Sequence, residues 1–103
     1  MSHINEITPE KLEEMLDNNQ DIHVIDVREN EEVAQGMIPT ATHIPLGHVP
    51  EAAPDLDKDK EYVMVCRSGK RSMNAATYLK ENGFNNVNNL AGGMLDWSGE
   101  KEF

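Results

Sequence analysis

Residues 62–72 read YVMVCRSGKRS, an apolar run that ends in the chain's one cysteine and continues into a short cationic turn. The apolar residues 62–65 are typical of a buried strand, and residues 72–82 predict a helix that begins just beyond Arg71. A loop between a strand and a helix turns backbone N–H groups inward, and these form a cradle for an anion. A thiolate at Cys66 is stabilised there, so we expect its pKa to be depressed.

A lone cysteine is often an inert core residue, because free cysteine is among the most buried residue types. Against that interpretation, three cations follow Cys66 within five positions: Arg67, Lys70 and Arg71. A cationic, partly exposed environment is typical of reactive thiols. We therefore favour a reactive thiol over an inert one.

The rest of the composition is acidic. The chain has 103 residues, with 9 lysines and arginines against 19 acids and a net charge of -10. Nucleic acids and anionic membranes both require a basic face, so we expect neither as a partner, whereas a small anion bound by the loop fits. The length fits a single domain over residues 1–103. Because no leader-like segment and no apolar run of membrane length occur, we expect a cytoplasmic protein.

A single cysteine excludes an internal disulfide, a dithiol pair and a multi-cysteine zinc site. The four histidines lack the spacing of metal ligands, so we expect no metal. They are His3, His23, His43 and His48.

Strands and helices alternate along the chain. The predicted strands are residues 22–27, 42–44, 62–65 and 86–90, and the predicted helices are 9–19, 29–35, 72–82 and 93–98. Thr8 is expected to cap the first helix, and the asparagine-rich residues 82–89 are interpreted as turn chemistry. Helices between strands require parallel crossover connections, so the pattern predicts an α/β fold whose sheet is covered on both faces.

Four segments, in this order, resemble the single-domain rhodanese family. They are DVRENEE (26–32) with AQGMIP (34–39), IPL (44–46), CRSGKRS (66–72) and LAGGMLDW (90–97). The resemblance covers nearly the whole chain and implies a three-layer sandwich around a central parallel sheet. It also implies a sulfurtransferase in which Cys66 carries a persulfide and no other cofactor is needed. Two positions depart from the family pattern: Met37 stands where a histidine is common, and Thr40 where a glycine is usual.

In the chemistry that the resemblance implies, a Cys66 thiolate attacks the outer sulfur of a small anionic donor such as thiosulfate and releases sulfite. Cyanide, or the thiol of a protein or small molecule, then takes the sulfur. Because the chain has no second cysteine to form a disulfide, the acceptor must come from outside.

For each cation of the cysteine loop, a role in the site can be weighed against a simpler structural interpretation. Arg71 is expected to aim its guanidinium at the loop or at the donor's oxyanion, since a solvated cation at a helix start opposes the helix dipole. Arg67 and Lys70 are expected to line the mouth and attract the donor. The simpler interpretation of both is a solvated surface cation.

The candidate site also includes the small residues of the loop and a nearby carboxylate and guanidinium, those of Asp26 and Arg28. Gly69 is expected to supply a backbone conformation closed to other residues. Ser68 and Ser72 offer hydroxyls to the sulfur or serve as turn and capping residues, and we expect capping for Ser72. Asp26 and Arg28 are expected to brace the site, with Arg28 paired to Asp26, Glu31 or Glu32.

Two other functions remain as alternatives to sulfur transfer. Dual-specificity phosphatases and related arsenate reductases share the fold, but their pattern has one residue more between cysteine and arginine than the four that separate Cys66 from Arg71. The tighter ring suits a single sulfur atom better than a tetrahedral oxyanion. The other alternative is a non-catalytic sulfide-sensing or protein-binding module, which has no need of Cys66 and its cations.

Overall fold

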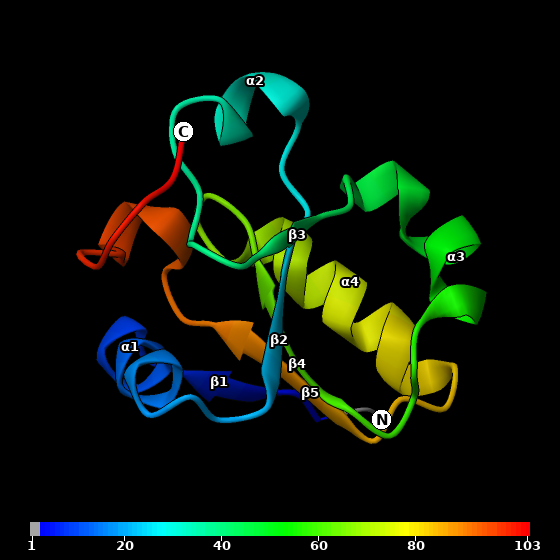
Figure 1. The fold of residues 1–103 in the computed structure, drawn as a ribbon. Helices are drawn as coiled ribbons and strands as arrows, with labels where there is room; N and C mark the ends of the chain where they lie inside the picture. The colour runs from blue at the N-terminus through cyan, green and yellow to red at the C-terminus, as the bar shows by residue number, and fades with distance from the viewer. Residues whose placement is uncertain (1–2) are drawn as a thin grey trace.

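The computed structural model describes residues 3–103, which form five strands in one sheet. The strands are β1 (Asn5–Ile7), β2 (Ile22–Asp26), β3 (Thr42–His43), β4 (Glu61–Val65) and β5 (Asn86–Leu90). They lie in the order β1-β5-β4-β2-β3, and every neighbouring pair is parallel (Figure 1). The predicted parallel sheet is therefore confirmed.

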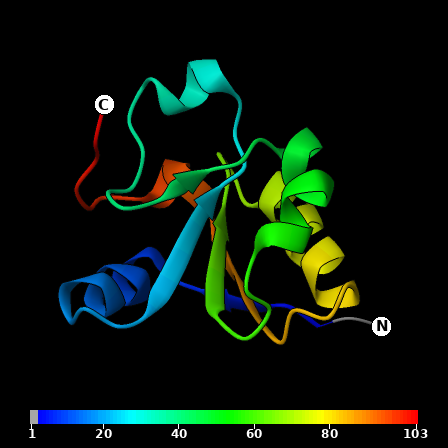
Figure 2. The ribbon, with the colours of Figure 1, turned by 45° about the vertical axis from the view of Figure 1, so that its right-hand side comes forward.

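Helices cover both faces of this sheet. The α-helices are α1 (Pro9–Asp17), α2 (Asn30–Val33), α3 (Val49–Ala52) and α4 (Lys70–Glu81), and the 3₁₀ turns are η1 (Leu46–His48), η2 (Ala53–Asp55) and η3 (Gly93–Asp96). Helix α1 lies on one side of the sheet and α3 and α4 on the other, while α2 lies beyond the carboxyl ends of the strands (Figures 1 and 2). This is the three-layer sandwich that the resemblance implies. No helix within residues 3–103 is long and apolar enough to cross a membrane.

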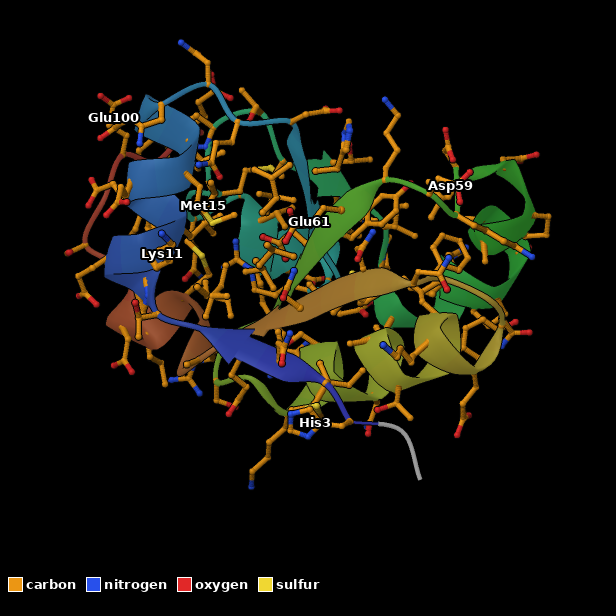
Figure 3. The ribbon with its side chains drawn as sticks, turned by 90° about the horizontal axis from the view of Figure 1, so that it is seen from below. His3, Lys11, Met15, Asp59, Glu61 and Glu100 are labelled. Atoms are coloured by element: carbon orange, nitrogen blue, oxygen red, sulfur yellow. The ribbon has the colours of Figure 1, made fainter. Side chains whose placement is uncertain are left out.

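Two apolar clusters hold the layers together, one on each face of the sheet (Figure 3). Because successive side chains of a strand point to opposite faces, β4 contributes to both: Val63 and Val65 to the α1 cluster, Met64 to the α4 cluster. The same alternation carries Cys66, the residue after β4, toward α4. A strand buried on both faces accounts for the unbroken apolar run before the cysteine.

Three features differ from the sequence prediction. Helix α4 begins at Lys70, two residues before the predicted start, because Gly69 occupies the N-cap with a left-handed φ of 102°. Strand β1 is absent from the prediction, since its three residues form a short edge strand without an apolar pattern. The interpretation of residues 82–89 as turn chemistry is wrong for residues 86–89, which belong to β5, whereas the predicted strand 86–90 matches β5 at both ends. The other predicted elements are present, with ends that differ from the prediction by no more than two residues.

Candidate active site

Cys66 lies at the carboxyl end of β4, at the base of the loop that leads into α4. Its side chain is buried, with an exposed fraction of 1%. In this respect Cys66 differs from the partly exposed environment that is typical of reactive thiols. The surroundings of the sulfur are nevertheless not purely apolar, because polar donors lie next to it.

The donors come from the loop and from the first turn of α4. The Gly69 amide donates to the Cys66 Sγ at 3.1 Å, and the Ser72 hydroxyl donates at 3.3 Å. The backbone amides of Ser68 and Ser72 also interact with the sulfur. The predicted cradle of amides is present. The capping role expected for Ser72 is wrong, because Gly69 takes the N-cap and the earlier helix start points the Ser72 hydroxyl at the thiol.

Two opposing effects set the pKa of the Cys66 thiol. Burial raises the pKa, but hydrogen bonds from Ser72, Gly69 and Ser68 lower it more, so that the pKa lies below the ordinary value of a cysteine. The predicted direction is confirmed. Its cause agrees with the expected cradle, because hydrogen bonds from the loop and from the first turn of α4 produce the lowering.

Arg71 points to α2 and not to the loop. Its guanidinium donates to the two carboxylate oxygens of Glu32 at 2.8 and 2.7 Å. This hydrogen-bonded pair lowers the pKa of Glu32 to about 2 and raises that of Arg71. The expected contact of Arg71 with the loop is therefore wrong, and its contact with a donor's oxyanion stays a prediction. The pair instead fastens the first turn of α4 to α2, which lies above the loop.

Asp26 and Arg28 form a buried pair behind Glu32. The Arg28 Nη2 donates to an Asp26 carboxylate oxygen at 2.8 Å, and both side chains are more than nine-tenths buried. The Arg28 Nε also donates to the Asp26 carboxylate, at 3.0 Å. Nη1 donates to the Glu32 carbonyl at 3.2 Å, and Nη2 also donates to the Gly36 carbonyl at 2.8 Å. The predicted pairing of Arg28 with Asp26 is thus present, whereas Glu32 accepts through its backbone. The pair holds α2 in the position where Glu32 meets Arg71.

Asn89 is a residue of the site that the sequence did not reveal. Its side chain is fully buried, and its Nδ2 donates to the Gly69 carbonyl at 3.0 Å. This bond helps to fix the left-handed Gly69, whose amide faces the sulfur. The interpretation of residues 82–89 as turn chemistry concealed it. The alternation within β5, which places Asn89 on the same face as Val87, is the signal that points to it.

The turn η3 supports the loop from the other side. The amide of Met94 donates to the Cys66 carbonyl at 2.9 Å, and that of Leu95 donates to the Arg67 carbonyl at 3.0 Å. Gly93 has a φ of 60°, and a Cβ at this position would lie 2.5 Å from both of these carbonyl oxygens. Glycine is therefore required where η3 approaches the loop.

Residues 8–100 of this chain match a family model described as "Rhodanese-like domain". The chain belongs to the rhodanese-like domain family. Among curated relatives, "Putative sulfurtransferase YtwF" of Bacillus subtilis is 55% identical over 94% of this chain and 93% of its own length. "Sulfurtransferase" of Allochromatium vinosum is 40% identical over 92% and 89%. The solved rhodanese-like domain protein of Staphylococcus aureus has a TM-score of 0.90 and 35% identity, covering 97% of this chain and 98% of that one.

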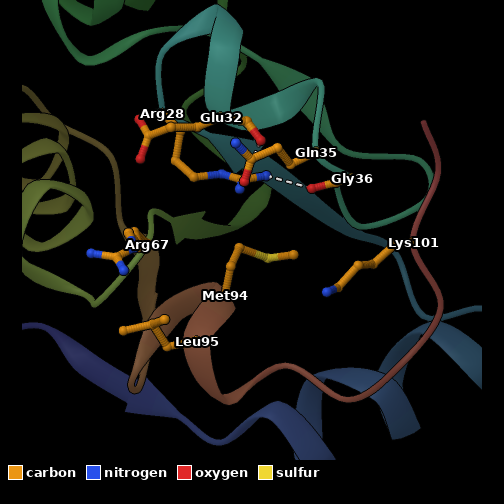
Figure 4. A pocket seen from close by; sticks show the side chains of 8 residues that line it. All are labelled: Arg28, Glu32, Gln35, Gly36, Arg67, Met94, Leu95 and Lys101. Atoms are coloured by element: carbon orange, nitrogen blue, oxygen red, sulfur yellow. Dashed lines mark hydrogen bonds between the residues drawn. The ribbon is translucent and has the colours of Figure 1, made fainter.

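This rhodanese-like domain has a pocket of about 420 Å³ beside the cysteine loop (Figure 4). Eight residues line it: Arg28, Glu32, Gln35, Gly36, Arg67, Met94, Leu95 and Lys101. Of the two cations expected at the mouth, Arg67 lines this pocket, whereas Lys70 is exposed on the first turn of α4 outside it. Neither forms an ion pair with any residue in the range 3–103.

The two departures of this rhodanese-like domain from the family pattern are at Met37 and Thr40. Met37 pairs through its backbone with Glu102, with N–H to O distances of 2.9 and 2.7 Å. Thr40 adopts a left-handed φ of 70°, the conformation that favours the glycine usual in the family. Neither residue lines the pocket beside the loop.

Proposed function

We propose that this rhodanese-like domain is a sulfurtransferase that carries a sulfane sulfur as a persulfide on Cys66. The main support for the proposal is the environment of the Cys66 sulfur. The pKa of this thiol is lowered, and the Gly69 amide and the Ser72 hydroxyl donate to the sulfur at 3.1 and 3.3 Å. These donors stabilise negative charge at the position where a thiolate attacks. Relatives named sulfurtransferases, similar over nearly the whole chain, support the same activity.

The proposed reaction has two steps. The Cys66 thiolate attacks the outer sulfur of thiosulfate, a new Sγ–S bond forms, and sulfite leaves with the electron pair of the broken S–S bond. Cyanide or a thiol then attacks the outer sulfur of the persulfide and restores the Cys66 thiolate. This is covalent catalysis by a nucleophile, so the kinetics are expected to be ping-pong.

In this proposal, some loop residues stabilise the sulfur and others attract the donor. The amides of Ser68, Gly69 and Ser72 hold the thiolate and then the persulfide anion. Arg67 and Lys70 are exposed beside the loop and attract an anionic donor to a protein whose net charge is otherwise strongly negative. Arg71 acts as a positioning residue, because its guanidinium is committed to Glu32.

The test is a steady-state assay with thiosulfate as donor and cyanide as acceptor, in which the formation of thiocyanate is measured. The proposal predicts parallel double-reciprocal lines when both substrates are varied, and complete loss of turnover in Cys66→Ser. An aryl phosphate serves as the comparison substrate. Hydrolysis of the aryl phosphate without formation of thiocyanate would favour a phosphatase and overturn the proposal.

A further inference from the structure

Strand β5 carries two consecutive buried asparagines, Asn88 and Asn89, with exposed fractions of 7% and 0%. Asparagine is depleted in strands, and a buried amide is costly unless its donors and its acceptor are paired. The Asn89 Oδ1 is buried and has no hydrogen-bond partner within residues 3–103. An apolar residue of similar shape avoids this cost. The stability of the core therefore does not account for an asparagine at position 89.

Asn89 lies on the face of the sheet that carries the cysteine. In the register of the strands, Asn89 is paired with Met64 of β4 on one side and with Glu6 of β1 on the other. Cys66 lies two positions beyond Met64, and both belong to the apolar cluster on the α4 face. The Asn89 amide is therefore next to the start of the cysteine loop.

The Nδ2 of Asn89 joins the edge strand β1 to this loop. It donates to the Glu6 Oε2 at 3.1 Å and to the Gly69 carbonyl at 3.0 Å. Because Nδ2 carries two hydrogens, it forms both bonds at once. A carboxylate only accepts hydrogen bonds, so Glu6 selects the nitrogen end of the amide, and the same nitrogen faces Gly69.

Gly69 connects this bond to the sulfur. Its carbonyl accepts from the Asn89 Nδ2 and also from the Met73 amide of α4, at 3.2 Å, while its own amide donates to the Cys66 Sγ at 3.1 Å. Glycine is the most permissive residue in its backbone angles, so the left-handed φ of 102° at Gly69 depends on such partners. Holding the carbonyl from β5 and from α4 keeps the amide directed at the sulfur.

We propose that Asn89 is a positioning residue for the Cys66 nucleophile, which holds the Gly69 peptide so that the Gly69 amide faces the sulfur. The inference rests on the proposed persulfide chemistry and adds a residue to it. Neither hydrogen bond of the Asn89 Nδ2 goes to the sulfur, so Asn89 acts through Gly69. Without Asn89, the Gly69 amide is less well placed to stabilise the thiolate before transfer and the persulfide anion after it.

A purely structural role for Asn89 is the competing explanation, and Asn88 provides a matched control. The Asn88 Nδ2 also donates to a carboxylate and to a carbonyl, those of Glu61 and Tyr62, both at 3.1 Å. These partners lie at the beginning of β4, at the opposite end of the strand from Cys66. The two asparagines thus share residue type, strand and kinds of bond, but only Asn89 is linked to the sulfur through Gly69.

The test compares Asn89→Leu and Asn88→Leu with the unaltered chain. Leucine has nearly the shape of asparagine but no donor. In Asn89→Leu, the pKa of the Cys66 thiol, followed by the ultraviolet absorbance of the thiolate, is expected to rise. Persulfide formation from thiosulfate near neutral pH is expected to slow by about two- to tenfold, the factor for one lost hydrogen bond. In Asn88→Leu, the thiol pKa and the rate are expected to stay unchanged, whether or not the midpoint of urea unfolding falls.

Asn89→Val, with a β-branched residue that strands favour, is the second variant and is expected to behave as Asn89→Leu. Circular dichroism and urea unfolding establish whether each variant is folded. An unchanged thiol pKa in a folded Asn89 variant, or an equal rise in Asn88→Leu, would overturn the assignment. Failure of both Asn89 variants to fold would identify Asn89 as a structural residue and would overturn it as well.

The thiol titration needs no sulfur donor, so it separates this inference from the proposed function. If the thiol pKa rises in Asn89→Leu but the unaltered chain gains no sulfur from thiosulfate, the proposed function fails and the positioning role stands. If the unaltered chain and Asn89→Leu gain sulfur at the same rate and share one thiol pKa, only the role of Asn89 fails.

Discussion

At Cys66, burial and hydrogen bonding act on the thiol in opposite directions. Burial raises its pKa, whereas donors from Ser72, Gly69 and Ser68 lower it more. The Ser72 hydroxyl is one of these donors and lies 3.3 Å from the sulfur. A side chain, and not only the loop backbone, therefore tunes the nucleophile.

Ser72→Ala removes this hydroxyl and leaves the backbone amides in place. We expect the pKa of the Cys66 thiol to rise, and its persulfide formation from thiosulfate near neutral pH to slow by about two- to tenfold, since one hydrogen bond is lost. The ultraviolet absorbance of the thiolate, followed during a pH titration, reports the shift. The control is Ser68→Ala, whose hydroxyl makes no hydrogen bond within residues 3–103. An identical titration of Ser72→Ala and the unaltered chain would contradict the role of the hydroxyl.

At the scale of the elements, the pair between Glu32 and Arg71 joins α2 to α4. The bidentate contact lowers the pKa of Glu32 from 4.5 to about 2. A carboxyl whose pKa is depressed by folding stabilises the folded state above its unfolded pKa, and this contribution is lost as the pH falls toward the folded pKa. The contribution of Glu32 is thus complete above about pH 4.5 and disappears toward pH 2.

Glu32→Gln is expected to lower the free energy of unfolding by about 1 kcal/mol at neutral pH, since the pair is partly exposed. Urea unfolding at a series of pH values is expected to show this difference shrinking between pH 4.5 and 2. The control is Glu31→Gln, because Glu31 is an exposed neighbour on α2 whose side chain makes no hydrogen bond or ion pair within residues 3–103. A difference that does not change with pH would show that the Glu32 charge is not responsible.

The close approach of η3 to the cysteine loop depends on Gly93. A Cβ there would clash with the carbonyl oxygens of Cys66 and Arg67 at a backbone φ of 60°. Gly93→Ala is therefore expected to lower the free energy of unfolding by about 2 kcal/mol or more and to slow persulfide formation, because the loop must move. Gly47→Ala, where nothing lies within 4 Å of the added Cβ, is expected to change neither. Equal unfolding midpoints for the two variants would refute the close-packing argument.

The sequence predicts the local part of this site and misses most of the distant part. The loop amides and the thiol are only a few positions apart, so strand, turn and helix signals were enough to bring them together. Glu32 lies 39 positions from Arg71, and Asn89 lies 20 positions from Gly69. No local pattern encodes those contacts, because they depend on how α2 and β5 are placed by the sheet.

Across the whole molecule, the parallel order of the strands collects the functional parts at one end. The cysteine loop follows β4, the pair of Asp26 and Arg28 ends β2, and η3 follows β5. The apolar runs predict these strands because both faces of the sheet are buried. The apolar pattern does not predict the edge strand β1, because this strand has only three residues and two of them are exposed.

The central claim, that Cys66 carries a transferable sulfur, is tested most directly by the intact mass of the protein after incubation with thiosulfate. The account predicts that the chain gains the mass of one sulfur atom, that cyanide removes this gain, and that Cys66→Ser shows neither change. An unchanged mass in the folded, fully reduced chain, or a sulfur gain that persists in Cys66→Ser, would contradict it.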